Sequence, residues 1–83
     1  MAKFTVYVLR SRKNGYRYVG QTDNMGRRLA EHNGGMTKSI LFQIPFVIEY
    51  TEEYNSRIDA IRREKFLKSG KGREWLEKNV DKK

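Results

Sequence analysis

The sequence of 83 residues contains no cysteine, a single histidine and a single proline. The lack of cysteine excludes disulfide bonds, thiolate zinc sites and cysteine nucleophiles, and it is typical of a protein from a reducing compartment. One histidine excludes a histidine-rich metal site. No apolar run approaches the roughly 20 residues of a membrane span, and residues 1–9 are too polar and too short for a signal peptide. We therefore expect a cytoplasmic protein with no membrane partner.

Positive charge is abundant and unevenly placed. The net charge is +8, and residues 1–41 carry eight basic and two acidic side chains, whereas residues 42–83 carry ten and eight. Concentrated positive charge favours a polyanionic partner such as nucleic acid. No segment combines a wide apolar face with a lysine-rich one, which disfavours a membrane surface. Aromatic residues spread along the chain indicate one folded domain over residues 1–83 rather than a basic tail.

The chain is predicted to begin with a β-hairpin. Lys3–Arg10 and Tyr16–Gln21 are rich in β-branched and aromatic residues, as strands are. Asn14–Gly15 between them is a strong signal for a two-residue turn.

The turn predicts which side chains share a face of the hairpin. A two-residue turn would pair Ser11 with Tyr18, so that odd positions of the first strand and even positions of the second lie on one face. Tyr7, Tyr18 and Gly20 should then lie together.

A short helix and a third strand are predicted next. Thr22-Asp23-Asn24 offers N-cap residues for a helix over Met25–Asn33, and Gly34–Gly35 should end that helix. Met36–Phe42 is expected to be irregular. Phe46–Tyr50 has the composition of a strand.

Two helices are predicted to complete the chain. Asn55–Ser56 should cap a helix that runs to about Lys68, and its buried side is marked by four apolar residues: Ile58, Ala60, Ile61 and Leu67. Glu64 falls at the edge of that apolar face. Ser69–Gly72 should break the helix before a last one over Arg73–Asn79. The order β-β-α-β-α-α predicts an α+β domain with a three-stranded, mainly antiparallel sheet flanked by helices.

The spacing of five residues resembles the GIY-YIG nuclease family: Tyr7, Tyr18, Arg28, His32 and Glu64. Thr5-Val6-Tyr7 corresponds to the first name-giving motif, with Thr5 in place of its glycine, and Tyr18-Val19-Gly20 corresponds to the second. The likeness spans Lys3 to about Lys68 and is greatest to the small stand-alone bacterial branch, the YhbQ-like proteins.

This resemblance implies a divalent-metal-dependent endonuclease that hydrolyses phosphodiester bonds of DNA, with a role in repair or recombination. Glu64 would hold one Mg²⁺ or Mn²⁺. Arg28 would grip phosphate oxygens, Tyr7 would activate or orient the attacking water, and Tyr18 would orient water or phosphate. His32 would assist proton transfer or contact phosphate.

The DNA expected as partner includes branched or single-stranded forms. Residues expected to contact it lie in the basic half of the chain: Gly20, Gln21, Arg27, Arg28 and Lys38.

Each residue also has an ordinary structural explanation. Both tyrosines suit an amphipathic sheet, an arginine on a helix is usually solvated, and Glu64 can pair with Arg28 or with Lys68. Two other functions therefore stay open. One is a nucleic-acid-binding or accessory module with the same fold and little or no catalysis, and the other is a basic structural or protein-interaction domain.

Overall fold

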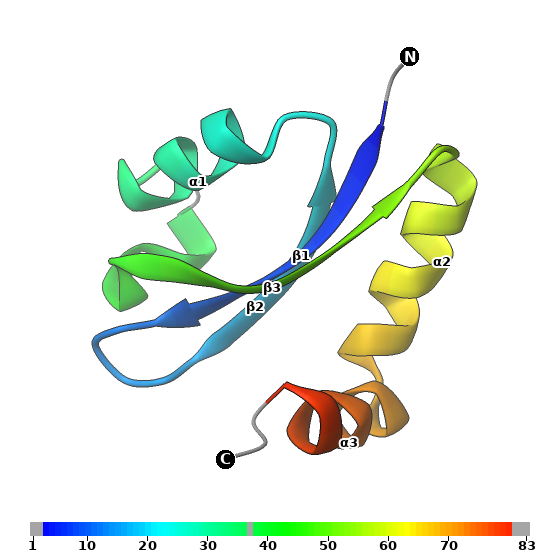
Figure 1. Ribbon diagram of the computed structural model, residues 1–83. Helices are drawn as coiled ribbons and strands as arrows, with labels where there is room; N and C mark the ends of the chain where they lie inside the picture. Colours follow the sequence, from blue (N-terminus) through cyan, green and yellow to red (C-terminus); the bar gives the residue numbers. More distant parts are fainter. Residues whose placement is uncertain (1–2, 37, 81–83) are drawn as a thin grey trace.

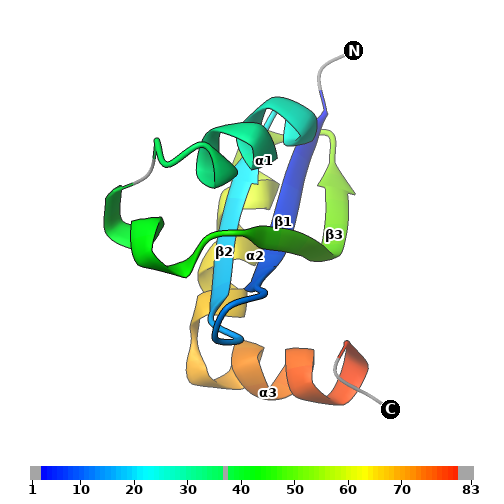
Figure 2. The same cartoon turned by 90° about the vertical axis from the view of Figure 1, so that its left-hand side faces the viewer.

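The computed structural model describes residues 3–36 and 38–80, with only the main chain at 38–40. Its strands form one antiparallel sheet with the order β2-β1-β3, and their bounds are Phe4–Ser11 (β1), Arg17–Thr22 (β2) and Phe46–Tyr54 (β3). The α-helices span Met25–Asn33 (α1), Arg57–Lys68 (α2) and Gly70–Asn79 (α3). Helix α1 lies on one side of the sheet, whereas α2 and α3 lie on the other (Figures 1 and 2). The α+β fold and the order β-β-α-β-α-α are confirmed.

The hairpin differs from its expected register by two residues. The backbone N–H of Ser11 donates to the carbonyl oxygen of Tyr16 at 2.8 Å, and Tyr7 pairs with Gly20. The predicted pairing of Ser11 with Tyr18 is therefore wrong, because the loop is longer than a two-residue turn. Side chains alternate with a period of two, so an even shift keeps Tyr7 and Tyr18 on the same face.

Strand β3 runs to Tyr54, four residues beyond the predicted end at Tyr50. The acidic residues in this stretch have low strand propensity. Glu52, however, accepts hydrogen bonds from the hydroxyls of Tyr50 and Tyr54, and Arg63 of α2 lies 2.9 Å from its carboxylate. Pairing of this stretch with β1 and the contact with Arg63 extend the strand.

Helix α3 begins at Gly70, three residues before its predicted start at Arg73. Ser69 alone separates α2 from α3, and its hydroxyl oxygen accepts from the backbone N–H of Gly72 at 3.1 Å. A β-carbon at Gly72 would lie 1.9 Å from the carbonyl oxygen of Phe66. Gly72 therefore serves close helix packing and does not break the helix.

The segment predicted to be irregular, Met36–Phe42, overlaps a 3₁₀ helix, η1, over Lys38–Gln43. Such short helices show no long apolar periodicity in the sequence, which is why the pattern did not predict this one.

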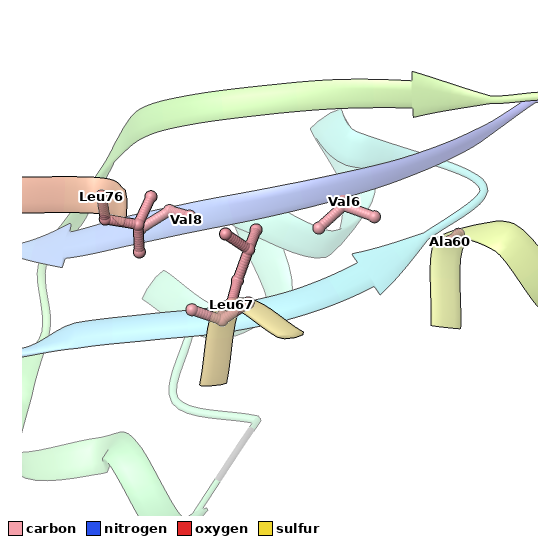
Figure 3. Close-up of a cluster of buried hydrophobic side chains, with 6 residues drawn as sticks. Val6, Val8, Ala60, Leu67 and Leu76 are labelled. Atoms are coloured by element: carbon pink, nitrogen blue, oxygen red, sulfur yellow. The ribbon is translucent and has the colours of Figure 1, made fainter. Parts of the chain in front are cut away.

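An aliphatic core fills the space between the sheet and the helices α2 and α3. Its buried members are Val6, Val8, Val19, Ala60, Leu67 and Leu76, and Figure 3 shows five of them. The prediction that Ile58 is buried is wrong, since it is 62% exposed. Ile58 precedes Ala60 by two positions, which places it about 160° away around the helix, on the solvent side.

Candidate active site

The face of the sheet under α1 holds a cluster of polar and aromatic rings. Tyr7 reaches it from β1 and Tyr18 from β2, while His32 comes from the last turn of α1. The Tyr7 hydroxyl oxygen lies 3.0 Å from Nε2 of His32. The ring centroids of Tyr18 and His32 are 4.8 Å apart in an edge-on arrangement, and those of Tyr7 and Tyr18 are 6.2 Å apart. The three rings therefore form one contiguous cluster.

Gly20 gives the Tyr7 ring its place in this cluster. A β-carbon at Gly20 would lie 2.5 Å from the Tyr7 hydroxyl oxygen and 3.3 Å from the Tyr18 ring. Because Gly20 is the cross-strand partner of Tyr7, the absent side chain lets the Tyr7 ring lie across β2. Any other residue at Gly20 would displace the hydroxyl.

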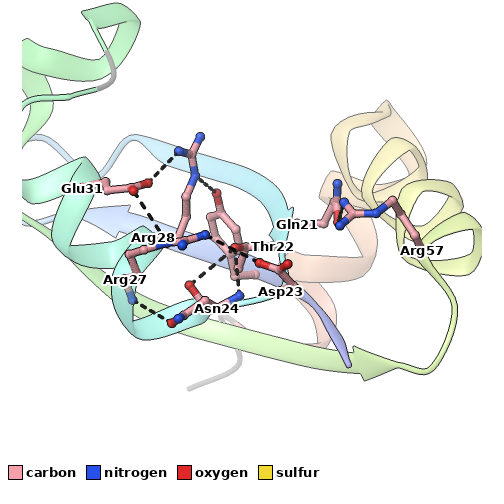
Figure 4. Close-up of polar contacts among 9 residues, drawn as sticks. Gln21, Thr22, Asp23, Asn24, Arg27, Arg28, Glu31 and Arg57 are labelled. Carbon is pink, nitrogen blue, oxygen red and sulfur yellow. Dashed lines mark hydrogen bonds and ion pairs between the residues drawn. The ribbon is translucent and has the colours of Figure 1, made fainter. Parts of the chain in front are cut away.

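Arg28 joins the cluster from α1, one helical turn before His32. Its Nε donates to the Tyr7 hydroxyl oxygen at 3.4 Å, and its Nη1 donates to Glu31 at 3.1 Å. Arg27 lies 3.7 Å from Glu31 and equally far from Asp23. Figure 4 shows both arginines turned toward Glu31. Glu31 therefore holds the two guanidinium groups in place and offsets part of their charge.

The surroundings shift the pKa values of these groups in directions that matter for chemistry. Burial raises the pKa of the Tyr7 hydroxyl, and the hydrogen bond from Arg28 reverses this only in part. Burial, together with the charge of Arg28, lowers the pKa of His32. The hydrogen bond to Tyr7 raises the pKa of Arg28. At neutral pH the cluster thus contains a neutral phenol, a neutral imidazole and a guanidinium cation.

Glu64 comes from α2, on the other side of the sheet from α1, and among the described residues it forms no hydrogen bond with the ring cluster (Figures 1 and 2). Its side chain is 20% exposed, and its carboxylate pairs with Lys68 at 2.7 Å. Its negative charge is close enough to Tyr7 to contribute to the raised pKa of that hydroxyl. The structure therefore brings four of the five predicted residues together in direct contact, and it places Glu64 within electrostatic range.

A single carboxylate such as that of Glu64 can be enough protein ligand for a Mg²⁺ ion. Among residues 3–36 and 38–80, His, Asp and Glu side chains form no group of three that could hold a cation. Mg²⁺ usually keeps several waters and is bound through one or two carboxylates and substrate phosphates. Glu64 is partly exposed and, within the described part of the chain, pairs with Lys68, so it fits that pattern.

The other expected DNA contacts are not all near the ring cluster. Gln21 pairs with Val6 of β1, on the side of the sheet that faces α2, and accepts a hydrogen bond from Arg57 at 3.4 Å. Arg27 is exposed on α1. The side chain of Lys38 lies outside the described part of the chain.

Some residues that position the cluster were not singled out from the sequence. The Asn33 side chain accepts from the backbone N–H of Phe46 at 2.6 Å and donates to its carbonyl oxygen at 3.1 Å, which fastens the end of α1 to β3. Glu31 could have been found from its spacing of three and four residues from the two arginines. No sequence signal indicates the role of Asn33.

Comparison with known proteins identifies the family. The profile described as the GIY-YIG catalytic domain matches residues 3–78. The chain belongs to the GIY-YIG family. A UPF0213 protein of Staphylococcus haemolyticus is 37% identical over 83% of this chain and 84% of its own length, and one of Halobacterium salinarum is 38% identical over 76% and 82%. The solution structure of a UPF0213 protein from Bacillus halodurans superposes with a TM-score of 0.54, at 30% identity, over 89% of this chain and 81% of that one.

Membership of the GIY-YIG family confirms the resemblance read from the sequence. It is a nuclease family, and its members are generally endonucleases that act on DNA and typically use a divalent metal ion. The names of the UPF0213 relatives state no specific activity. In the described part of the chain no helix is long and apolar enough to cross a bilayer.

Proposed function

We propose that this protein is a divalent-metal-dependent endonuclease that hydrolyses DNA phosphodiester bonds. Tyr7, Tyr18, Arg28 and His32 would act on the phosphate, and Glu64 of α2, whose charge reaches the Tyr7 hydroxyl, would hold the metal ion. The observation that carries the proposal is the hydrogen-bonded group of Tyr7, His32 and Arg28 at the motif positions of a nuclease family.

Arg28 is suited to bind the phosphate that is cut. Its side chain is 36% exposed, and within the described residues its Nη2 has no hydrogen-bond partner. The guanidinium can therefore hold a phosphate oxygen while its Nε keeps the Tyr7 hydroxyl in place. Because it stays charged at every working pH, it also stabilises the extra negative charge of the transition state.

Tyr7 and His32 together can take a proton from the attacking water. Tyr7 alone is a poor base, because its pKa is raised rather than lowered. With the imidazole proton on Nδ1, however, Nε2 of His32 accepts the Tyr7 hydroxyl. The hydroxyl can then receive a proton from water while it passes its own to His32. The lowered pKa of His32 favours return of that proton, so the pair resets after each reaction.

Tyr18 and Glu64 complete the proposed site. The Tyr18 ring packs edge-on against His32. Within the described residues no hydrogen bond engages its hydroxyl, which would orient water or phosphate. Glu64 would hold one Mg²⁺ or Mn²⁺ after releasing Lys68. Such an ion supplies positive charge to neutralise the phosphate and the leaving oxygen.

The decisive experiment compares wild type with Glu64→Gln on single-stranded, duplex and branched DNA, with Mg²⁺ or Mn²⁺. We expect metal-dependent cleavage to be lost while DNA binding stays equal or becomes slightly tighter, because a negative charge is removed. Glu74→Gln is the matched control, since Glu74 is an exposed glutamate on α3, and it should cleave like wild type. Melting curves establish that each variant is folded.

The outcome also separates the alternatives. If folded wild type and Glu64→Gln show the same background cleavage on every substrate, the catalytic assignment is wrong and a nucleic-acid-binding module is the better account. A binding module would still show affinity that falls steeply with salt, with a log–log slope of about −0.9 per phosphate contact on duplex DNA. A structural domain would show no such binding.

A further inference from the structure

A groove lies beside the candidate active site, between the start of β2 and the corner of α2 and α3. Its volume is about 540 Å³, within the range of about 300–1,000 Å³ that is usual for small-ligand sites. Its floor is apolar and is formed by Val19, Leu67 and Leu76, which belong to the buried core. The floor is therefore preformed by packing that the fold requires in any case.

The two walls of the groove differ in chemistry. On the β2 side stand Tyr16, which is 45% exposed, and Tyr18. On the helix side stand Lys68 at the end of α2, and Arg73 and Glu77 on α3. Aromatic rings facing cationic groups are the combination that binds unpaired nucleotides, whose bases stack on the rings while cations hold the phosphates.

Arg73 is the cation of this wall that is most open to a ligand. It is exposed, and no ion pair engages it among residues 3–36 and 38–80. Lys68 by contrast is held by Glu64 at 2.7 Å. Arg17, at the other end of the groove, is held by Glu49 at 2.9 Å. A phosphate in the groove would therefore meet Arg73 without first displacing a partner among these residues.

The groove is continuous with the candidate active site at two points. Tyr18 lines the groove and also packs against His32, with ring centroids 4.8 Å apart. Lys68 lines the groove and pairs with Glu64, the proposed metal ligand, one helical turn earlier. Arg28 lies on the α1 side of the sheet and the groove floor on the α2–α3 side, but β2 is an edge strand, so a nucleic-acid strand with a phosphate at Arg28 can pass around this edge at Tyr18 into the groove.

We propose that this groove is a nucleotide-binding subsite that holds one unpaired nucleotide next to the phosphate that is cut, with its base against Tyr16 and its phosphate on Arg73. The inference rests on the proposed function and specifies its substrate: a single strand, or the unpaired part of a branched DNA. A base inside a duplex offers no free face to Tyr16, so duplex DNA would make only backbone contacts here.

The inference is tested by binding measurements in EDTA, which need no cleavage. The probes are a fluorescein-labelled oligothymidine strand and a labelled hairpin duplex with the same number of nucleotides, followed by fluorescence anisotropy. The variants are Tyr16→Ala, Tyr16→Phe and Arg73→Ala. Arg62→Ala is the matched control for Arg73→Ala, because Arg62 is also an exposed helical arginine (79% exposed side chain) and does not line the groove.

We expect Tyr16→Ala to weaken binding of the single strand by about 5-fold or more, the usual effect of losing one base–aromatic stack. Tyr16→Phe keeps the ring and should bind like wild type. Arg73→Ala should also weaken the single strand more than Arg62→Ala does, while the duplex responds equally to both. Neither Tyr16 nor Arg73 is in the core, so melting temperatures should stay close to that of wild type.

Three results would overturn the inference. If Tyr16→Ala and Arg73→Ala match the control on both probes, the groove does not hold nucleic acid, and a peptide pairing with the β2 edge becomes the better occupant. If both probes lose affinity equally, the groove is a general phosphate surface. In both cases the nuclease assignment can still stand on its cleavage assay. If wild type binds neither probe at low salt, the subsite and the proposed function fail together.

Discussion

The two faces of the sheet share a central strand but hold different chemistry. Alternate residues of β1 point to opposite sides: Val6 and Val8 enter the aliphatic core under α2 and α3, whereas Tyr7 and Leu9 enter the cluster under α1. The fully buried members of the first cluster are all aliphatic. The second contains a fully buried histidine and a tyrosine hydroxyl that satisfy each other's hydrogen bonds.

The difference shows how one small sheet can hold a stabilising core on one face and a polar cluster on the other. Each fully buried aliphatic side chain contributes about 1.5–3 kcal/mol, whereas a buried polar group costs free energy unless it is hydrogen-bonded. The aliphatic face therefore carries stability, and the other face can carry groups chosen for chemistry. Substitutions on the aliphatic face should accordingly lower the free energy of unfolding, whereas substitutions on the α1 face should mainly lower the rate of cleavage.

The largest difference between the two faces is expected from substitutions of two adjacent residues of β1. Tyr7→Phe removes only the hydroxyl, and we expect cleavage to fall by about 100-fold or more, because proton transfer in the transition state is lost. Stability should fall by about 1–3 kcal/mol, because Nε2 of the buried His32 loses its hydrogen bond to the hydroxyl. Rates come from single-turnover cleavage and stability from urea unfolding.

Val8→Ala is the control for Tyr7→Phe. It should cost about 2 kcal/mol of stability through the lost methyl groups, yet its folded fraction should cleave at the wild-type rate. If Tyr7→Phe cleaves normally, the division of chemistry between the faces is wrong.

A second comparison lies within α2. Leu67→Ala should lower the free energy of unfolding by about 2–5 kcal/mol, because Leu67 is 1% exposed and its loss leaves a cavity. Ile58→Ala on the same helix should change it by less than about 0.5 kcal/mol, because Ile58 faces solvent. Urea denaturation of both variants measures the difference. Equal losses would contradict the observed placement of the aliphatic core.

The smallest effect should be a pH dependence of stability caused by His32, which lies on the α1 face. The pKa of His32 is lowered from 6.5 in the folded protein. At neutral pH both the folded and unfolded states are neutral at this residue. As the pH falls below about 6.5, the unfolded chain takes up a proton before the folded protein does, so stability decreases.

Melting temperatures between pH 7.5 and 5 would reveal this decrease, and His32→Gln should flatten it. Glu52 titrates in a separate window: burial alone would raise its pKa, but hydrogen bonds from Arg63 and Tyr50 lower it below 4.5. The stability that the ionised Glu52 carboxylate contributes is therefore lost only at more acidic pH. A His32→Gln profile with the same slope as wild type would show that His32 is not the titrating group.

The sequence was sufficient for those parts of the fold that depend on local signals. Helix α1 has the predicted bounds Met25–Asn33, because Asn24 caps it and Gly34–Gly35 end it. Tyr7 and Tyr18 share a face although the predicted register was wrong by two residues, since the alternation of a strand tolerates an even shift. The spacing of Arg28 and His32 likewise predicted their common side of α1.

What the sequence could not supply depends on contacts between distant segments. Strand β3 is extended by Arg63, and α3 starts early because Gly72 meets α2. The raised pKa of Tyr7 follows from burial, which no local pattern reports. The groove joins Tyr16 to Arg73, which are 57 positions apart, and no motif connects them. The roles of the five site residues stay predictions until they are measured.

Gly72 controls the width of the groove between β2 and the helices α2 and α3. Its side chain is one hydrogen atom, which permits the spacing between α2 and α3, since an added β-carbon would collide with the Phe66 carbonyl oxygen. Arg73 is the next residue of α3, so a larger side chain at position 72 would push α3 away from α2 and move Arg73 outward from the groove. The smallest possible side chain at position 72 thus sets the width of the groove, and a larger one would change which ligands fit there without altering any lining residue.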